Sequence, residues 1–157
     1  GLFVERTGPQ RFRATLTRLP AGRVQVFELT GDQWRVEART LDWHGLAAQI
    51  GLDRMYRLER LGTRATRPLS GPAAAGSSFS LGTDGPNDLW ARGRTSPAWM
   101  RHVHGGHAGG PWSPLANGAL FTIWLDGAAV RVEPGNEAAA AAMKPPAGTR
   151  AEASALR

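Results

Sequence analysis

The chain has 157 residues, 41% of them hydrophobic, a size that suits one globular domain with a core but not two. Its net charge of +6 comes mainly from arginines spread along the chain among acidic residues, which favours a solvated surface over a nucleic-acid interface. The absence of cysteine excludes disulfides, thiolate metal sites and cysteine nucleophiles, and no stretch reaches the roughly 20 apolar residues that span a bilayer.

Residues 11–42 alternate polar and apolar side chains as half-buried β-strands do. The first run covers residues 11–18 and the third covers residues 33–40. Their inward-facing positions are Phe12, Ala14, Leu16, Trp34, Val36 and Ala38. Both turns, at residues 20–22 and 30–32, contain glycine, so the stretch predicts a three-stranded antiparallel meander.

The middle run, residues 23–29, has apolar side chains on both faces. Val24 and Val26 point opposite to Phe27 and Leu29. Either both faces of this strand are covered, or a β-bulge shifts its parity.

The rest of the chain predicts further short elements. In chain order they are an irregular or helical crossover at 41–52, a fourth strand at 54–62, a long loop at 63–86, short helices at 88–90 and 97–103, a Gly/Pro-rich loop at 105–114, a hairpin at 119–133 and a helix at 137–142 capped by Asn136. The hairpin is centred on Asp126-Gly127, a sequence typical of two-residue hairpin turns.

These elements predict a β-rich α+β fold with a single antiparallel sheet of about five or six strands, formed by the meander and the C-terminal hairpin and covered by short helices. Residues 1–10 are expected to be a juxtamembrane stub or an edge strand. Residues 11–143 are expected to be the globular domain, and residues 144–157 a flexible tail.

Three histidines lie within six residues, at His102, His104 and His107. Imidazole is a common ligand of transition metals, so this loop is a candidate for weak metal binding. Its spacing matches neither a His-Glu-x-x-His helix nor a zinc finger, and no carboxylate is near it in sequence.

Catalytic and phosphate-binding motifs are not found. No serine stands in a Gly-x-Ser-x-Gly elbow, and the glycines between residues 71 and 85 are not followed by the lysine of a P-loop. The sequence therefore predicts neither an enzyme nor a cofactor site.

The chain has six tryptophans but only one tyrosine. Trp34 and Trp124 lie on predicted strands and are expected in the core. The other four fall in predicted crossovers or loops, where tryptophan either roofs the core or forms a contact patch. The candidates for such a patch are Trp43, Trp90, Trp99 and Trp112.

Several stretches together resemble a group of uncharacterised bacterial membrane-anchored proteins that often bear the names "cation/multidrug efflux pump" or "multidrug transporter". They are GPQRFRA at 8–14, FELTGDQW at 27–34, YRLERLG at 56–62, DLW at 88–90, ANGA at 116–119 and PGNEA at 134–138. The chain departs from the pattern at residues 68–79 and 102–114.

The resemblance implies a transmembrane hairpin followed by a soluble domain, with arginines in the loop between the two helices. By the positive-inside rule that loop is cytoplasmic, so the soluble domain would lie in the periplasm. The transporter name finds no physical support, because a pump needs several membrane spans.

We therefore expect a non-enzymatic accessory or interaction domain of a membrane-associated protein complex, on the periplasmic side of the bacterial inner membrane and held by an N-terminal anchor absent from this chain. The alternative is a periplasmic small-ligand or transition-metal-binding protein that uses the histidine-rich loop. An exposed apolar tryptophan patch would favour the first, and convergent histidine side chains the second. Neither nucleic acid nor a small-molecule substrate is an expected partner.

Overall fold

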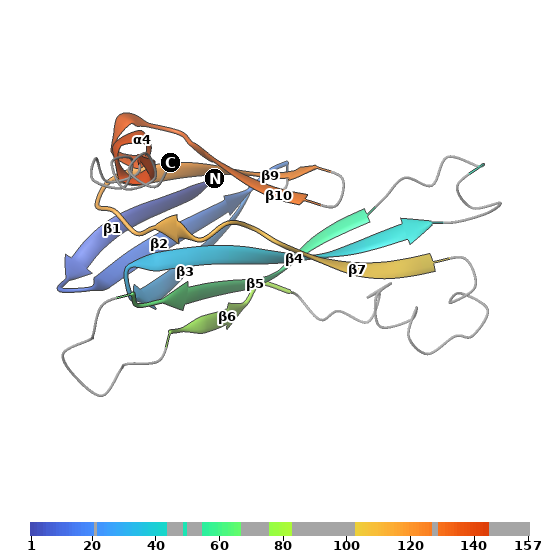
Figure 1. The fold of residues 1–157 in the computed structure, drawn as a ribbon, viewed down its shortest axis with the longest axis horizontal. Coiled ribbons are helices and arrows are strands. Elements are labelled where there is room, and N and C mark those ends of the chain that lie inside the picture. The colour runs from blue at the N-terminus through green and yellow to red at the C-terminus, as the bar shows by residue number, and fades with distance from the viewer. Residues whose placement is uncertain are drawn as a thin grey trace, which may run out of the picture.

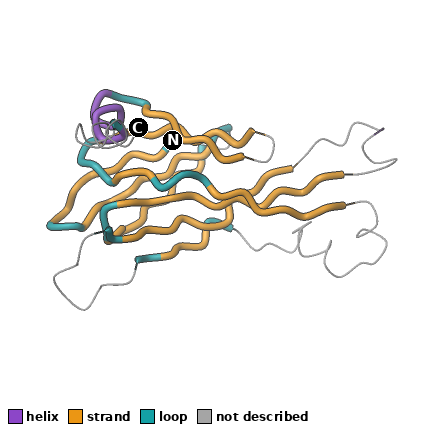
Figure 2. Tube along the Cα trace, in the orientation of Figure 1, coloured by secondary structure: helices purple, strands orange, loops and turns teal. Residues whose placement is uncertain are grey.

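Two antiparallel β-sheets pack face to face in a computed structural model of the protein (Figure 1). The structure describes residues 1–20, 22–43, 49, 55–66, 76–82, 103–126 and 129–144. Strands account for most of this part of the chain (Figure 2). The prediction of a β-rich fold is confirmed, whereas the prediction of a single sheet is wrong.

The first sheet contains β1 (Leu2–Gly8), β2 (Arg11–Arg18), β3 (Arg23–Thr30), β9 (Ala119–Asp126) and β10 (Ala129–Pro134), in the spatial order β10-β9-β1-β2-β3. The second contains β4 (Gln33–Trp43), β5 (Met55–Arg64), β6 (Ser78–Ser80), β7 (Val103–Gly109) and β8 (Ser113–Pro114). Its order is β6-β5-β4-β7, with β8 paired to β4. The strands β4, β5 and β7 extend past the end of the first sheet (Figure 1).

The core lies between the two sheets, because the inward positions of both carry apolar side chains. Trp34 of β4 is fully buried, and its ring meets that of Phe121 on β9 edge-on, with centroids 5.2 Å apart. All six inward positions expected in residues 11–18 and 33–40 are buried, which confirms the predicted alternation.

The turn at residues 30–32 carries the chain from the first sheet to the second. β3 pairs with β2, whereas β4 pairs with β5 and β7, so the predicted meander is wrong at its second turn. Gly31 has a φ of +131° and donates its N–H to the carbonyl of Gln10. The next amide, of Asp32, donates to the carbonyl of Arg64 on β5. Alternation fixed which side chains face inward, but it did not fix which strands pair.

The middle run, β3, shows neither of the two arrangements expected for it. Its register with β2 is continuous, without a bulge, from Arg11 opposite Thr30 to Arg18 opposite Arg23. The side chains of Val24 and Val26 are 59% and 56% exposed, so the second face of this strand is open to solvent.

The first strand, β1, is a central strand and not the edge strand or stub expected of residues 1–10. It pairs with β2 on one side and with β9 on the other. Leu2 and Val4 are fully buried in the core. The N-terminal run therefore belongs to the globular domain.

The predicted loop at residues 105–114 contains most of β7 and all of β8, and the predicted loop at 63–86 contains β6. Because glycine is depleted in strands, the glycine-rich sequence of β7 predicted a loop and not a strand. A Cβ at Gly106 would lie 2.5 Å from the Oγ1 atom of Thr40. Glycine here lets β7 approach β4 closely.

The C-terminal elements agree with the sequence. β9 and β10 pair as the predicted hairpin, and the fourth strand appears as β5. Helix α4 (Glu137–Met143) begins after Asn136, whose Oδ1 atom accepts the N–H of Ala139 at 3.0 Å. It contacts β8, β9 and β10, and its Ala139 is fully buried in the core.

Other predicted elements fall largely outside the described residues. This holds for the helices at 88–90 and 97–103, apart from Val103, which begins β7. In the predicted crossover at 41–52, β4 continues to Trp43 and most of the rest lies outside. The predicted tail lies outside them except for Lys144.

We predict that Gly31→Ala destabilises the protein more than Gly22→Ala. A Cβ at Gly31 would lie 2.6 Å from the carbonyl oxygen of Arg64, and φ there is +131°. Gly22 has a φ of +62°, and no described atom lies within 4 Å of a Cβ placed there. The expected losses in the free energy of unfolding are about 3 kcal/mol for Gly31→Ala and about 1 kcal/mol for Gly22→Ala. Urea denaturation measures both, and equal losses would contradict the role of Gly31 in the crossing.

Candidate functional site

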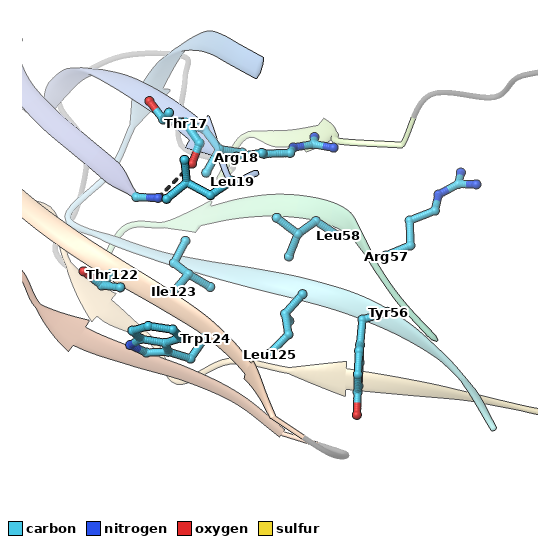
Figure 3. Close-up of a pocket in the computed structure, with 12 residues that line it drawn as sticks. Thr17, Arg18, Leu19, Tyr56, Arg57, Leu58, Thr122, Ile123, Trp124 and Leu125 are labelled. Atoms are coloured by element: carbon cyan, nitrogen blue, oxygen red, sulfur yellow. Dashed lines mark hydrogen bonds between the residues drawn. The ribbon is translucent and has the colours of Figure 1, made fainter. Parts of the chain in front are cut away.

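A cleft of about 510 Å³ opens where the first sheet ends and the second continues (Figure 3). Its lining comes from the end of β2 and the turn after it, from the start of β5 and from the end of β9. Small-molecule sites commonly have volumes of about 300–1,000 Å³. The cleft is thus large enough for a small ligand.

The interior of the cleft is apolar. Leu16, Leu58, Ile123 and Leu125 line it from three strands. Leu16 is buried in the main core. Leu58 and Ile123 pack against both the main core and a smaller cluster that includes Val130, and Leu125 packs against the smaller cluster. This end of the core is therefore less enclosed than the middle of the sandwich.

Arg18 brings a positive charge to the rim of this cleft. Its Nη2 atom donates to the Oε1 atom of Gln25 at 2.5 Å and to the carbonyl of Leu81 at 2.6 Å. Burial lowers the pKa of Arg18, and the charges of Arg23 and Arg57 lower it further. Its Nε atom is buried and has no hydrogen-bond partner among the described atoms.

Arg57 of β5 also lines the cleft. A Cβ added at Gly82 would lie 2.5 Å from its Nη2 atom, so the absence of a side chain at residue 82 makes room for this arginine. Arg18 holds the carbonyl of Leu81, the preceding residue. The side chains of both arginines thus lie close to the backbone of residues 81 and 82.

No motif in the sequence indicated this cleft. Its lining residues come from stretches about 40 and 65 residues apart along the chain, so only tertiary packing brings them together.

Large apolar side chains are also exposed on the outer face of the first sheet. Phe3 is 36% exposed and Trp124 is 53% exposed, and Val24 and Val26 are exposed on the edge strand β3 of the same sheet. Leu19, in the turn after β2, is 84% exposed. The register places Val26 opposite Thr15, Thr15 opposite Phe3, and Phe3 opposite Leu120.

The histidine-rich stretch falls mainly on β7 or outside the described residues. His102 lies outside them, and of His104 only the backbone position, opposite Asp42, is described. The side chain of His107 is 73% exposed, with its Nε2 atom 3.6 Å from the Oε2 atom of Glu59. Within the described part of the chain, no group of three or more His, Asp or Glu side chains could hold a metal ion. The metal site stays a prediction.

The structure describes two of the four candidate contact tryptophans. Trp43 is partly buried at the end of β4, and Trp90 and Trp99 lie outside the described residues. Trp112 is partly buried, with the guanidinium carbons of Arg35 and Arg64 at 4.8 and 4.3 Å from its ring centroid. The described tryptophans therefore do not gather into one exposed patch.

The two tryptophans expected in the core behave differently. Trp34 is buried as predicted, whereas Trp124 is on the outer face, where its Nε1–H donates to the Oε2 atom of Glu133 at 2.9 Å. On β9 the inward positions are those of Phe121, Ile123 and Leu125, so the parity of the strand places Trp124 outside.

Comparisons of the chain with protein-family models, with curated proteins and with solved structures gave no match. Among the described residues, none belongs to a helix with the length and apolar character needed to cross a membrane. The functional argument therefore depends on the cleft and the exposed face themselves.

We predict that Trp112 stabilises the fold by packing against two cations, those of Arg35 and Arg64. Trp112→Ala removes both cation–π contacts and is expected to lower the free energy of unfolding by about 2 kcal/mol. Trp112→Phe keeps a ring between Arg35 and Arg64 and should restore about half of the loss. Urea denaturation of the two variants provides the comparison, and unchanged stability in Trp112→Ala would indicate a tryptophan that does not support the fold.

Proposed function

We propose that this protein is a non-enzymatic interaction domain that serves as an accessory subunit of a membrane-associated complex. The observation that carries the proposal is the apolar outer face of the first sheet, defined by Phe3, Val24, Val26 and Trp124. Large apolar side chains gathered on one surface are typical of protein contacts.

The strand register places three of these side chains, those of Phe3, Val24 and Val26, in adjacent rows. One row runs across four strands through Val26, Thr15, Phe3 and Leu120. Val24 lies in the next row, opposite Thr17. The apolar side chains thus form a surface with short polar residues between them, which another chain can contact over several strands.

Charged side chains border this face. Arg13 and Glu28 form an exposed ion pair, with Arg13 Nε 2.9 Å from Glu28 Oε1, and Glu5 lies opposite Arg13 in the register. The carboxylate of Glu28 raises the pKa of Arg13. An apolar centre with a charged rim is the usual anatomy of a protein interface.

The outer face of the second sheet has a different character. There Arg39 pairs with Glu59, Arg35 pairs with Glu37, and Arg64 donates to Gln33. Because these polar groups already satisfy one another, this face offers less apolar area to a partner. The contrast favours the first sheet as the contact surface.

The cellular setting in this proposal comes from the resemblance to membrane-anchored bacterial proteins. That resemblance supports a location on the periplasmic side of the inner membrane, with the domain held near the bilayer by an N-terminal anchor. A partner in the same membrane would then meet the apolar face at high effective concentration.

The alternative of metal binding through His102, His104 and His107 has less support. The one described histidine side chain among them lies near a single carboxylate, that of Glu59. One imidazole and one carboxylate do not complete a tetrahedral site.

We predict that Val24→Thr combined with Val26→Thr disrupts the partner complex. Threonine keeps the β-branched shape of valine but replaces one methyl group with a hydroxyl, so each site loses about 1 kcal/mol of apolar contact. Together the changes should lower partner recovery about tenfold or more. The measurement is a pull-down of the full-length protein from its own membranes in gentle detergent, with quantitative identification of co-purified proteins.

The matched control is Arg60→Ser, which changes an exposed side chain on the second sheet and should leave recovery unchanged. Recovery of the full-length protein alone would overturn the accessory-subunit proposal. Equal recovery with the double variant and with wild type would exclude the first sheet as the contact surface.

A further inference from the structure

We infer that the outer edge of β3 pairs with the same edge of a second copy of this chain, antiparallel and about a two-fold axis at Gln25. The first sheets of the two copies would then form one continuous sheet. The inference goes beyond the proposed function, because it concerns a strand edge and a second copy of the chain rather than a sheet face and another protein.

The side of β3 that faces away from β2 has no described neighbour in the sheet. β3 ends the strand order of the first sheet, and among the described strands only β2 pairs with it. An antiparallel strand directs alternate backbone N–H and C=O groups to each of its two sides. A further strand can therefore pair with the groups on the side away from β2.

The other described sheet edges carry protective features that β3 lacks. β6 has only three residues, Ser78–Ser80. β10 ends at Pro134 and contacts β7, so these two edge strands partly cover each other. β3 has eight residues, no proline or lysine, and a register with β2 that contains no bulge. Short strands, proline, lysine and bulges are the usual means of preventing edge pairing, so β3 is the described edge most suited to it.

The side chains at the centre of β3 also favour pairing. Val24 and Val26 are exposed, and no charged residue lies between Arg23 and Glu28. In the outer face, Val26 has Thr15 of β2 on one side and no described strand residue on the other. β-branched apolar residues on a strand gain stability from an apolar neighbour on the next strand.

A second copy fits this edge because the sequence of β3 is complementary to itself. With the axis at Gln25, Val24 of each copy lies opposite Val26 of the other copy, and both pairs are on the outer face. Arg23 lies opposite Phe27, so no two like charges face each other directly. The four valines of the two copies would thus lie together at the join.

The neighbouring register fits less well. Moving the axis to Val26, the next position that keeps every side chain on its own face, would place Val24 opposite the carboxylate of Glu28. In the proposed register Glu28 lies opposite Gly22 and keeps its ion pair with Arg13. Side-chain chemistry therefore selects the axis at Gln25.

Pairing at this edge should end at two copies. A two-fold contact uses the same surface of both copies, so the dimer consumes both β3 edges. The remaining described edges are those of β6, β7 and β10, which carry the protective features given above. We therefore expect a discrete dimer and not a fibre.

The test is sedimentation equilibrium of the purified protein, with no partner protein present. We expect a reversible dimer of the 16.8 kDa chain at micromolar concentrations. Val26→Lys places a charge at the join without changing a buried side chain, and should weaken the dimer about tenfold or more. Circular dichroism and the thermal midpoint must show that the variant is folded, and Val24→Lys takes its place if it is not.

The matched control is Trp124→Lys. It adds the same charge to the same outer face, but on β9, which β1 and β2 separate from β3. The dimer should be unchanged in this variant. A dimer that is lost in Trp124→Lys and kept in Val26→Lys would indicate stacking of the outer faces and would overturn edge pairing.

Cysteine cross-linking tests the register, because the chain has no cysteine of its own. Under mild oxidation, a mixture of Val24→Cys and Val26→Cys should form disulfide-linked dimers faster than either variant alone, since directly opposed residues are closer than diagonal ones. Faster cross-linking of Val26→Cys with itself would contradict the axis at Gln25.

A wild-type protein that stays monomeric would overturn the inference and leave the edge of β3 to a strand of another protein. Unchanged dimerisation in the folded lysine variants of β3 would also overturn it. Because these measurements contain no partner protein, their result is separate from that of the membrane pull-down. Self-association and the accessory role can therefore fail independently.

Discussion

The two-sheet arrangement depends on the crossing between β3 and β4. In this segment the amide of Gly31 donates to Gln10, the amide of Asp32 donates to Arg64, and the carbonyl of Asp32 accepts from Leu115. Three backbone hydrogen bonds thus join the crossing to a turn of the first sheet, to a strand of the second and to the segment after β8. The turn directs Trp34, which begins the buried face of β4, into the core against Phe121.

This crossing closes one end of the sandwich, and the cleft lies at the other end. There β4, β5 and β7 continue beyond the first sheet (Figure 1), so their inner positions have no full layer of strands above them. Leu58 and Leu125 are partly buried for this reason. An apolar surface left incomplete at the end of a sandwich is a natural place for a ligand.

The outer faces of the two sheets differ in the polarity of their side chains. On the second sheet, Arg39 and Glu59 satisfy each other, and Trp112 lies against two arginines. On the first sheet, Val24 and Val26 face solvent without such neighbours to cover them. The first sheet thereby leaves apolar side chains open to solvent, whereas the outer face of the second sheet carries paired charges.

The sequence by itself determined the local structure. Alternation at residues 11–18 and 33–40 placed Phe12 and Trp34 inward, and Asn136 marked the start of α4. These features depend on side-chain periodicity and on local hydrogen bonds, both of which can be read within a few residues.

Tertiary structure alone decided how the strands assemble. The sequence of β3 and β4 is equally compatible with a hairpin and with a change of sheet, and the choice depends on partners as distant as Arg64. The glycine-rich strand β7 carries almost no pattern of its own and is stabilised by pairing with β4. The cleft likewise exists only because Arg18, Arg57 and Leu125 meet across long stretches of chain. Contacts between residues far apart in sequence leave no periodic trace, so the strand pairing and the binding site both had to come from the folded structure.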